Sequence, residues 1–239
     1  MSELAIDTSF DFRSDARGKD PDSHSPTLRR YHRLLWSKAL PDGRSFELNA
    51  TTPGVYLHHR SDLGEFFLSS DSIIPTFTRW KRMADIVGHY SEAENDAFRG
   101  LSYTIGGMMI FPSNQVNKLP TLNGARGLTR SIADRMDLTL ECIRLFYLGK
   151  ESPLGATLER YREFFEIFGD FSGYVGFFLL QDLVEPDLSR VKFLHPFADF
   201  NGNAVPSDLE SYRAYRAQTI AFIHARNRRI EEWVTGGLA

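Results

Sequence analysis

The residues best suited to chemistry lie just before a predicted helix, in the stretch Asn123-Gly124-Ala125-Arg126-Gly127. Free amide groups and the dipole at a helix start attract anions, and glycines let the backbone approach an oxyanion closely. Arg126 could add a bidentate contact to a phosphate or carboxylate, so Asn123 and Arg126 are candidate ligand-binding residues. The alternative is a structural arginine in a glycine-rich helix start. The stretch lacks the Lys-Ser/Thr pair of a P-loop, so a Walker-type site is not supported.

Charged residues recur at helical spacing further along the chain, at Arg130, Asp134, Asp137, Glu141 and Arg144. Asp137 and Glu141 lie one turn apart, which makes them candidates for an acid–base pair or for two metal ligands. The alternative is a solvated helix face with intrahelical ion pairs. No group of His, Cys and Asp residues has zinc-like spacing, so no metal site is predicted.

A strand-like stretch places Tyr56, His58 and Arg60 on one face, because side chains alternate along a strand. Histidine titrates near neutrality, so His58 beside Arg60 is a candidate acid–base residue and Arg60 a candidate ligand contact. The adjacent His59 points to the other face, so the two histidines do not chelate one metal as neighbours. The alternative for His58 is a half-buried, hydrogen-bonded histidine.

A third candidate is His195, which opens the segment His-Pro-Phe-Ala-Asp-Phe-Asn-Gly-Asn up to Asn203. This segment resembles the active-site loop of the Fic family, which transfers AMP or related groups from nucleotides to protein hydroxyls. The resemblance implies that His195 is the general base and Asp199 the metal ligand. It also implies that Asn201 and Gly202 form part of an anion nest for the phosphates.

The segment departs from the Fic pattern at three positions that contact phosphate in that family. Phe200 replaces a small residue, Asn203 replaces the first arginine, and Pro206 stands in place of the second. A long helix should also precede the motif, but Pro186 and a strand-like stretch intervene. The alternative is an ordinary turn, since Asn, Gly and Asp are common in loops.

Two groups of basic residues could form a phosphate-binding surface if the fold brings them together. One group lies in the first predicted helix and the other in the last. Their members are Arg29, Arg30, Arg33 and Lys38, and Arg213, Arg216, Arg226, Arg228 and Arg229. If they do not converge, they are ordinary solvated faces.

The elements that must position these residues change in type along the chain, with strands first and helices later. This order predicts an α+β fold, with a mostly antiparallel sheet from the N-terminal half packed by helices from the C-terminal half. We expect one domain over residues 1–239, with residues 1–26 as a polar, partly extended segment. The expected helices cover 27–38, 78–87, 128–148, 154–168, 173–183 and 207–234, and the expected strands 46–48, 55–60, 65–70, 102–111 and 191–194.

Composition narrows the class of protein. The 239 residues carry 28 Lys and Arg against 31 Asp and Glu, a net charge of −3, which argues against a dedicated nucleic-acid domain. A single cysteine, Cys142, cannot form an internal disulfide, which favours a reducing compartment. The N-terminus does not have the pattern of a signal peptide, and no apolar stretch is long enough to cross a membrane. We therefore expect a cytoplasmic protein without a membrane partner.

Several stretches together resemble an uncharacterised bacterial family of unknown function. They are 31–38, 56–77, 106–127, 134–147 and 173–184, and they span nearly the whole chain. The resemblance implies a bacterial, cytosolic, single-domain protein, and it implies no activity or cofactor.

Three functions follow from these patterns. The first is binding of a phosphate-bearing ligand, a small nucleotide or a nucleic acid, in a polar cleft walled by Asn123, Arg126, His58 and Arg60. The second is a non-catalytic interaction module, for instance the partner of a toxin or phage component, which the 19 Phe and 9 Tyr residues could support. The third is a Fic-like nucleotidyl transferase centred on His195.

Overall fold

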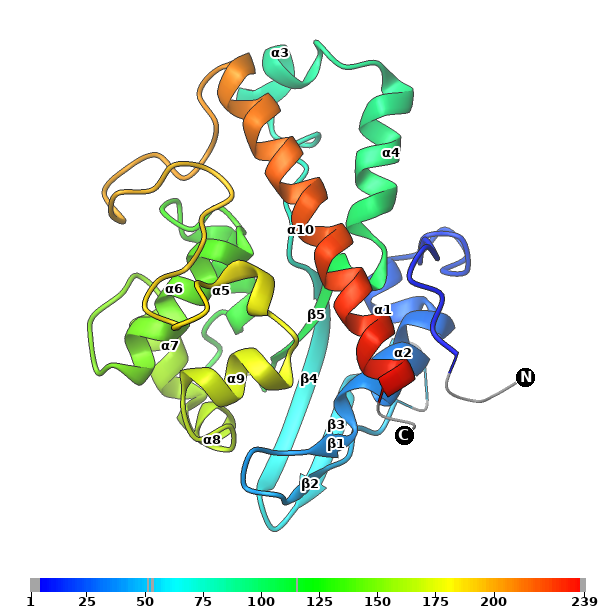
Figure 1. Ribbon diagram of the computed structural model, residues 1–239, viewed down its shortest axis with the longest axis vertical. Coiled ribbons are helices and arrows are strands. Elements are labelled where there is room, and N and C mark those ends of the chain that lie inside the picture. Colours follow the sequence, from blue (N-terminus) through cyan, green and yellow to red (C-terminus); the bar gives the residue numbers. More distant parts are fainter. Residues whose placement is uncertain (1–4, 51, 53, 115, 237–239) are drawn as a thin grey trace.

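The computed structural model describes residues 5–50, 52, 54–114 and 116–236, and has the α+β architecture that the sequence predicts (Figure 1). Its strands all lie in the N-terminal half, and helices make up most of the C-terminal half. The strands are β1 (Lys38–Ala39), β2 (Ser45–Phe46), β3 (Leu57–Ser61), β4 (Gly64–Ser72) and β5 (Met108–Pro112). The longer helices are α2 (Pro26–Trp36), α4 (Glu92–Ser102), α6 (Met136–Tyr147) and α10 (Leu209–Gly236). The shorter ones are α1 (Pro21–His24), α3 (Ala84–Val87), α5 (Leu122–Leu128), α7 (Gly155–Arg160), α8 (Arg162–Glu166) and α9 (Phe171–Phe177).

The larger sheet has three antiparallel strands in the order β3-β4-β5, and β1 and β2 form a separate pair. β3 and β4 form the hairpin that the sequence predicts, and their last pair joins Leu57 to Leu68. β4 continues beyond this point and pairs with β5 through Ser72 and Met108. Among the described residues, the 69–72 part of β4 therefore has a strand on one side only, and the short helix α1 contacts β4. We call this stretch the open edge of β4.

Helix α10 ties the two halves together. In Figure 1 it runs along the long axis of the molecule, with α4 on one side and the group α5–α9 on the other. Its start is capped by Asp208, whose carboxylate accepts from the amide of Ser211 at 2.8 Å. The fully buried Arg226 donates to the carbonyls of Gly106 and Leu179, and so links the start of β5 to the end of α9.

Two predicted elements differ from the structure near the open edge. The predicted strand 102–111 begins only at Met108, because residues 92–102 form α4, a helix that the sequence reading missed. Its capping box, in which Ser91 and Glu94 exchange hydrogen bonds, was the available signal. The chain then turns tightly at Gly107, where a Cβ would lie 2.2 Å from the carbonyl oxygen of Ser102.

The predicted helix 128–148 begins eight residues later, at Met136. Ala133 and Asp134 adopt positive φ angles of 51° and 63°, which no helix accommodates. The described part of the N-terminal segment contains turns and α1, with extended backbone at Asp20 and Ser25, and it packs inward through the buried Phe12. Residues 1–4 lie outside the described residues. None of the helices within the described ranges is long and apolar enough to cross a bilayer.

Candidate active site

The best-defined polar centre is an ion pair between Asp71 on β4 and Arg126 on α5. Arg126 Nη1 donates to Asp71 Oδ2 at 2.7 Å, and the side chain of Arg126 is completely buried. Its other donors are engaged too, with Nε bound to Thr139 Oγ1 at 3.1 Å and Nη2 bound to the carbonyl of Asp134 at 2.9 Å. The guanidinium also lies 4.6 Å from the ring centroid of Phe111. Arg126 therefore orients Asp71 and supports the chain at Asp134.

Asp71 lies in a cavity of about 190 Å³ at the end of the open edge. Two further carboxylates reach this cavity, Asp22 from α1 and Asp134 from the segment before α6. Two arginines and a tyrosine also line it. We call this cavity the acidic cleft, and its charged or titratable residues are Asp22, Asp71, Asp134, Arg79, Arg99 and Tyr103.

Burial and mutual repulsion favour the protonated forms of the acidic cleft. Burial raises the pKa of Asp71 to about 7, and the neighbouring Asp134 adds to this, although Arg126 opposes it. Burial raises the pKa of Asp22 well above its usual range, with Asp71 and Asp20 adding to the effect. The pKa of Asp134 is raised by burial as well, against the opposing charge of Arg126. Because these carboxylates interact electrostatically, protonation of one affects the proton affinity of the others.

The backbone around the acidic cleft is strained. Phe77, Ala133 and Asp134 have φ angles of 58°, 51° and 63°, a region that residues other than glycine rarely occupy. Arg126 holds the last of these from both sides, because its carbonyl also accepts from the Asp134 amide at 3.1 Å. Strain of this kind costs of the order of 1–3 kcal/mol per residue and is concentrated at functional sites.

The structure separates the residues that the sequence placed in one polar cleft. Asn123 and Arg126 lie inside α5, whose first amides are capped by Thr121, so the predicted anion-binding loop before the helix is not formed. Asn123 donates to Ser69 Oγ at 2.8 Å. His58 and Arg60 line a different cavity, of about 520 Å³, and neither Asn123 nor Arg126 is among its wall residues.

The other sequence candidates are held by partners of their own. The completely buried Asp137 forms an ion pair with Arg135 and accepts from the Leu194 amide at 2.9 Å. Glu141 is 8% exposed and binds Arg144 at 2.8 Å. The predicted solvated stripe is therefore wrong at Asp137, and the structure does not bring the two carboxylates together at a shared ligand. His58 contacts Glu65, with 2.9 Å between Nε2 and Oε1.

His195 lies in an irregular segment between the Val184–Val191 bridge and α10. Its backbone carbonyl accepts from Arg135 at 3.2 Å, and its Nδ1 is buried without a partner in the described structure. Burial lowers the pKa of His195, and the charge of Arg135 adds to this. The helix that precedes the Fic motif is absent from this part of the described chain, so the structure lends the resemblance no support.

Three of the five basic residues predicted on the last helix are engaged within the protein. Arg226 is used inside the core, and Arg229 binds Asp182 at 2.8 Å. Arg216 stacks on Tyr90, with 3.9 Å from its guanidinium carbon to the ring centroid. From the first basic group, Lys38 lies 4.7 Å from the ring centroid of Trp233 on α10.

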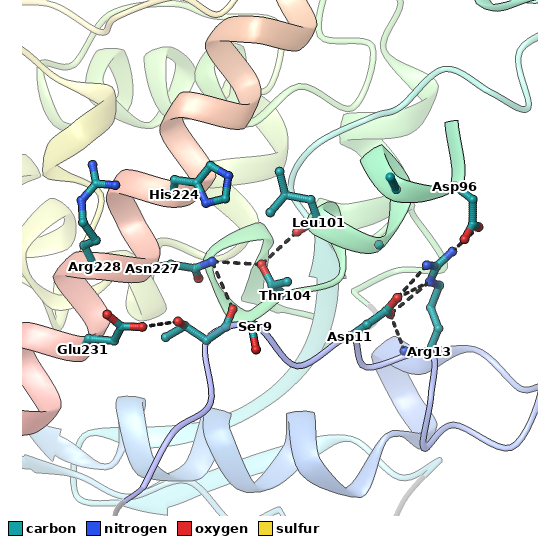
Figure 2. Close-up of a pocket in the computed structure, with 13 residues that line it drawn as sticks. Ser9, Asp11, Arg13, Asp96, Leu101, Thr104, His224, Asn227, Arg228 and Glu231 are labelled. Atoms are coloured by element: carbon teal, nitrogen blue, oxygen red, sulfur yellow. Dashed lines mark hydrogen bonds and ion pairs between the residues drawn. The ribbon is translucent and has the colours of Figure 1, made fainter. Parts of the chain in front are cut away.

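A separate cavity of about 440 Å³ lies where the N-terminal segment meets α4 and α10 (Figure 2). Figure 2 shows Arg13 bound to both Asp11 and Asp96, at 2.6 and 2.7 Å. Asn227 donates to Thr104 Oγ1 at 3.2 Å and accepts from the Gly106 amide. Most of the polar groups that line this cavity are thus paired with one another. The cavity is therefore the junction that holds the N-terminal segment in place, and we do not treat it as a ligand-binding site.

Two features of the acidic cleft were missed from the sequence. Asp71 follows two serines at the end of a strand, a polar run directly after the apolar residues 66–68 that could have signalled a site. Asp22 sits in a segment taken for a loop, and only the fold brings it to β4. Within the described ranges, no group of three or more His, Cys, Asp or Glu side chains is arranged to hold a metal ion.

Residues 6–230 match a family of unknown function, DUF6994. Comparisons with curated proteins and with solved structures gave no significant match.

Proposed function

Since the chain belongs to this family of unknown function, its activity has to be inferred from the site, and we propose that the acidic cleft performs acid–base chemistry on a small polar molecule. The observation that carries the proposal is the position of Asp71. It lies in a cleft beside two other carboxylates, one of its oxygens is fixed by a buried arginine, and its pKa is about 7. A group that titrates near the working pH is the most effective proton donor and acceptor.

Each neighbour has a role in this chemistry. Arg126 binds Asp71 Oδ2, which leaves Oδ1 to exchange a proton with a substrate. Negative charge on Asp22 or Asp134 raises the proton affinity of Asp71, as paired carboxylates do for one another in acid–base enzymes. Arg79 and Arg99 line the same cavity and supply positive charge for an anionic substrate. The proposal therefore keeps the phosphate-bearing small molecule expected from the sequence, but places it in the acidic cleft, which is lined by other residues than those predicted.

The first test measures the proton affinity directly. In protein labelled with ¹³C at the aspartate carboxyl carbons, we expect the Asp71 resonance, identified by its disappearance in Asp71→Asn, to titrate near pH 7. The exposed Asp96, whose pKa is lowered by Arg13, serves as an internal reference that titrates in the acid range. An Asp71 resonance that titrates below pH 5 would rule out the acid–base role.

The second test looks for turnover. Nitrophenyl phosphate, a nitrophenyl glycoside and a nitrophenyl ester together sample the bonds that general acids and bases cleave. We expect one of them to be hydrolysed with a pH profile that inflects near 7, and Asp71→Asn to lower the rate by about 10²–10⁴-fold. Asp96→Asn should retain the rate. Equal rates in the two variants would contradict the proposal.

A second function is supported by a different feature. Val55, Tyr56 and Phe67 are 58%, 52% and 37% exposed, and the rings of Tyr56 and Phe67 lie 6.3 Å apart on the β3–β4 hairpin. Exposed aromatic residues are favoured at protein interfaces. The interaction module therefore remains the alternative proposal, and it predicts that Tyr56→Ser weakens capture of a protein partner without changing the Asp71 titration.

We also propose that the protein works in the bacterial cytoplasm. The single cysteine, Cys142, is completely buried and unpaired, as is usual in a reducing compartment. Cell fractionation of the native host tests this location, and recovery from the extracellular fraction would contradict it.

A further inference from the structure

Arg29 is a buried arginine that has no partner in the described structure. It lies on α2 and is 4% exposed, and its Nε is buried without a hydrogen bond. No carboxylate of the described residues forms an ion pair with it. Burial lowers the pKa of Arg29, because the guanidinium has lost contact with water. A buried charge left in this condition costs several kcal/mol of stability.

The other fully buried arginines show how the chain treats a guanidinium that serves structure. Arg126 binds Asp71, and Arg135 binds Asp137. Arg226 has no carboxylate, but its three nitrogens donate to four backbone carbonyls. Arg29 is the exception among these buried arginines, and it lines a cavity.

This cavity, of about 280 Å³, lies against the open edge of β4, and we call it the Arg29 recess. Ser69 and Ser70 line it from β4, and Tyr56 lies at its exposed rim. The two hydroxyls are already oriented, since Ser69 accepts from Asn123 and Ser70 contacts His32 Nε2 at 2.8 Å. Unpaired amide groups of a strand edge add donors to such a surface.

The Arg29 recess adjoins the acidic cleft. Asp22 lines both cavities, and residues 69–70 of β4 face one while residues 71–72 face the other. Asp20 and Asp22 are the carboxylates that line the recess, and burial raises the pKa of Asp22, which favours its protonated form. A protonated carboxyl is a hydrogen-bond donor.

We propose that the Arg29 recess binds the phosphate monoester group of the small molecule whose reacting part lies in the acidic cleft. Guanidinium donors match two phosphate oxygens in a bidentate pair, and the Asp22 carboxyl and serine hydroxyls remain for the third. A carboxylate has only two oxygens and would leave these donors unused. The inference rests on the proposed function for the rest of the substrate, but anion binding is measured on its own.

The experiment titrates the full chain with inorganic phosphate and with phenyl phosphate, followed by calorimetry and thermal unfolding. At about 100 times the dissociation constant, phosphate should raise the Tm of the wild type by about 5–10 °C. Arg29→Met should lose this shift and keep or raise the Tm of the free protein, because an unpaired buried charge is replaced by an apolar chain. Arg29→Lys keeps the charge without the planar fork and should bind at least about tenfold more weakly.

Two controls separate the possible failures. Arg33→Met removes an exposed arginine of the same helix that lines the cavity of His58 and Arg60, and it should bind phosphate like the wild type. Asp96→Asn changes a carboxylate that lines neither the Arg29 recess nor the acidic cleft, and it should also bind phosphate like the wild type. No binding to the wild type, or binding by Arg29→Met within twofold of it, overturns the proposal, as does a loss only in Arg33→Met. If Asp71 titrates below pH 5 and phosphate still binds, only the proposed acid–base function is overturned.

Discussion

Replacing Arg126 by methionine separates a structural arginine from a ligand-binding one. The change keeps an unbranched apolar side chain over Phe111 but removes the hydrogen bonds to Asp71, Thr139 and the Asp134 carbonyl. Removing one partner of a buried ion pair leaves the other charge uncompensated, which typically costs 3–5 kcal/mol. We therefore expect Arg126→Met to lower the free energy of unfolding by about that amount at pH 8. A residue that only binds ligand would leave it nearly unchanged.

The loss should depend on pH. Arg126 lowers the pKa of Asp71, so removal of Arg126 raises that pKa above its value of about 7 in the wild type. Arg126 stabilises the ionised form, and that contribution is present above the pKa of Asp71 and is lost as the pH falls through it. The difference between Arg126→Met and the wild type should therefore be smaller at pH 5.5 than at pH 8. Asp71→Asn in the Arg126→Met background should recover part of the loss at pH 8.

Urea unfolding at the two pH values gives the measurement, provided that the slope against urea is unchanged. Arg162→Met is the matched control, because the ion pair of Arg162 with Glu159 is about half exposed and should contribute less than about 1 kcal/mol. A loss below 1 kcal/mol in Arg126→Met, or equal losses at pH 5.5 and pH 8, would refute the electrostatic explanation.

Three further changes give independent outcomes. Burial raises the pKa of Asp71 from 3.8 to about 7, so the folded protein holds an extra proton between these pH values. The free energy of unfolding should therefore fall as the pH rises through this range, by up to about 1.4 kcal/mol per pH unit. Asp71→Asn should lose this slope in urea unfolding between pH 4.5 and 8. Gly173→Ala should destabilise the protein by at least about 1–3 kcal/mol, because a Cβ at this position would lie 2.0 Å from the Phe168 carbonyl oxygen. Gly176→Ala on the same helix meets nothing within 4 Å and should be neutral or stabilising. Similar Tm values for the two variants would contradict this packing. The Cys142 thiol, whose pKa burial raises to about 12, should resist a disulfide reagent at pH 8 until denaturant is added, and rapid reaction of the native protein would show that it is accessible.

Local patterns were sufficient for the elements that carry their own signals. The first long helix was predicted at 27–38 and is Pro26–Trp36, since its apolar face is periodic and Ser25 caps it. The β3–β4 hairpin and the last helix were also predicted. Alternation of apolar and polar residues marks the strands, and a long stretch of helical periodicity marks the helix, and both patterns are visible in the sequence alone. The helix Glu92–Ser102 was missed although Ser91 and Glu94 form a capping box, and only two of its residues are buried.

The site failed to emerge from the sequence for a different reason. Arg126 was identified as a functional arginine, but nothing local shows that its partner is Asp71, 55 residues earlier. Asp137 was read as solvent-facing because helical spacing gives the face but not what covers it. It is covered by residues near Leu194, in a segment without regular structure. Whether a polar residue is buried depends on the tertiary structure. A charged residue that a periodic pattern places on a solvent-facing surface can therefore be buried and paired in the folded protein.

The geometry of the sheet explains why the polar groups gather where they do. β3 has five residues and β4 has nine, so β4 runs past its partner and exposes one edge over residues 69–72. An unpaired strand edge needs polar neighbours, and the chain supplies α1 with Asp22 at one end and Arg29 of the next helix at the other. Only part of this polarity is satisfied internally, because Asp71 has Arg126 while Arg29 has no partner among the described residues. If the open edge is a binding site, ligands should protect the amides of residues 69–72 from hydrogen exchange. Protection confined to the His58 and Arg60 cavity would place the site on the other side of the hairpin.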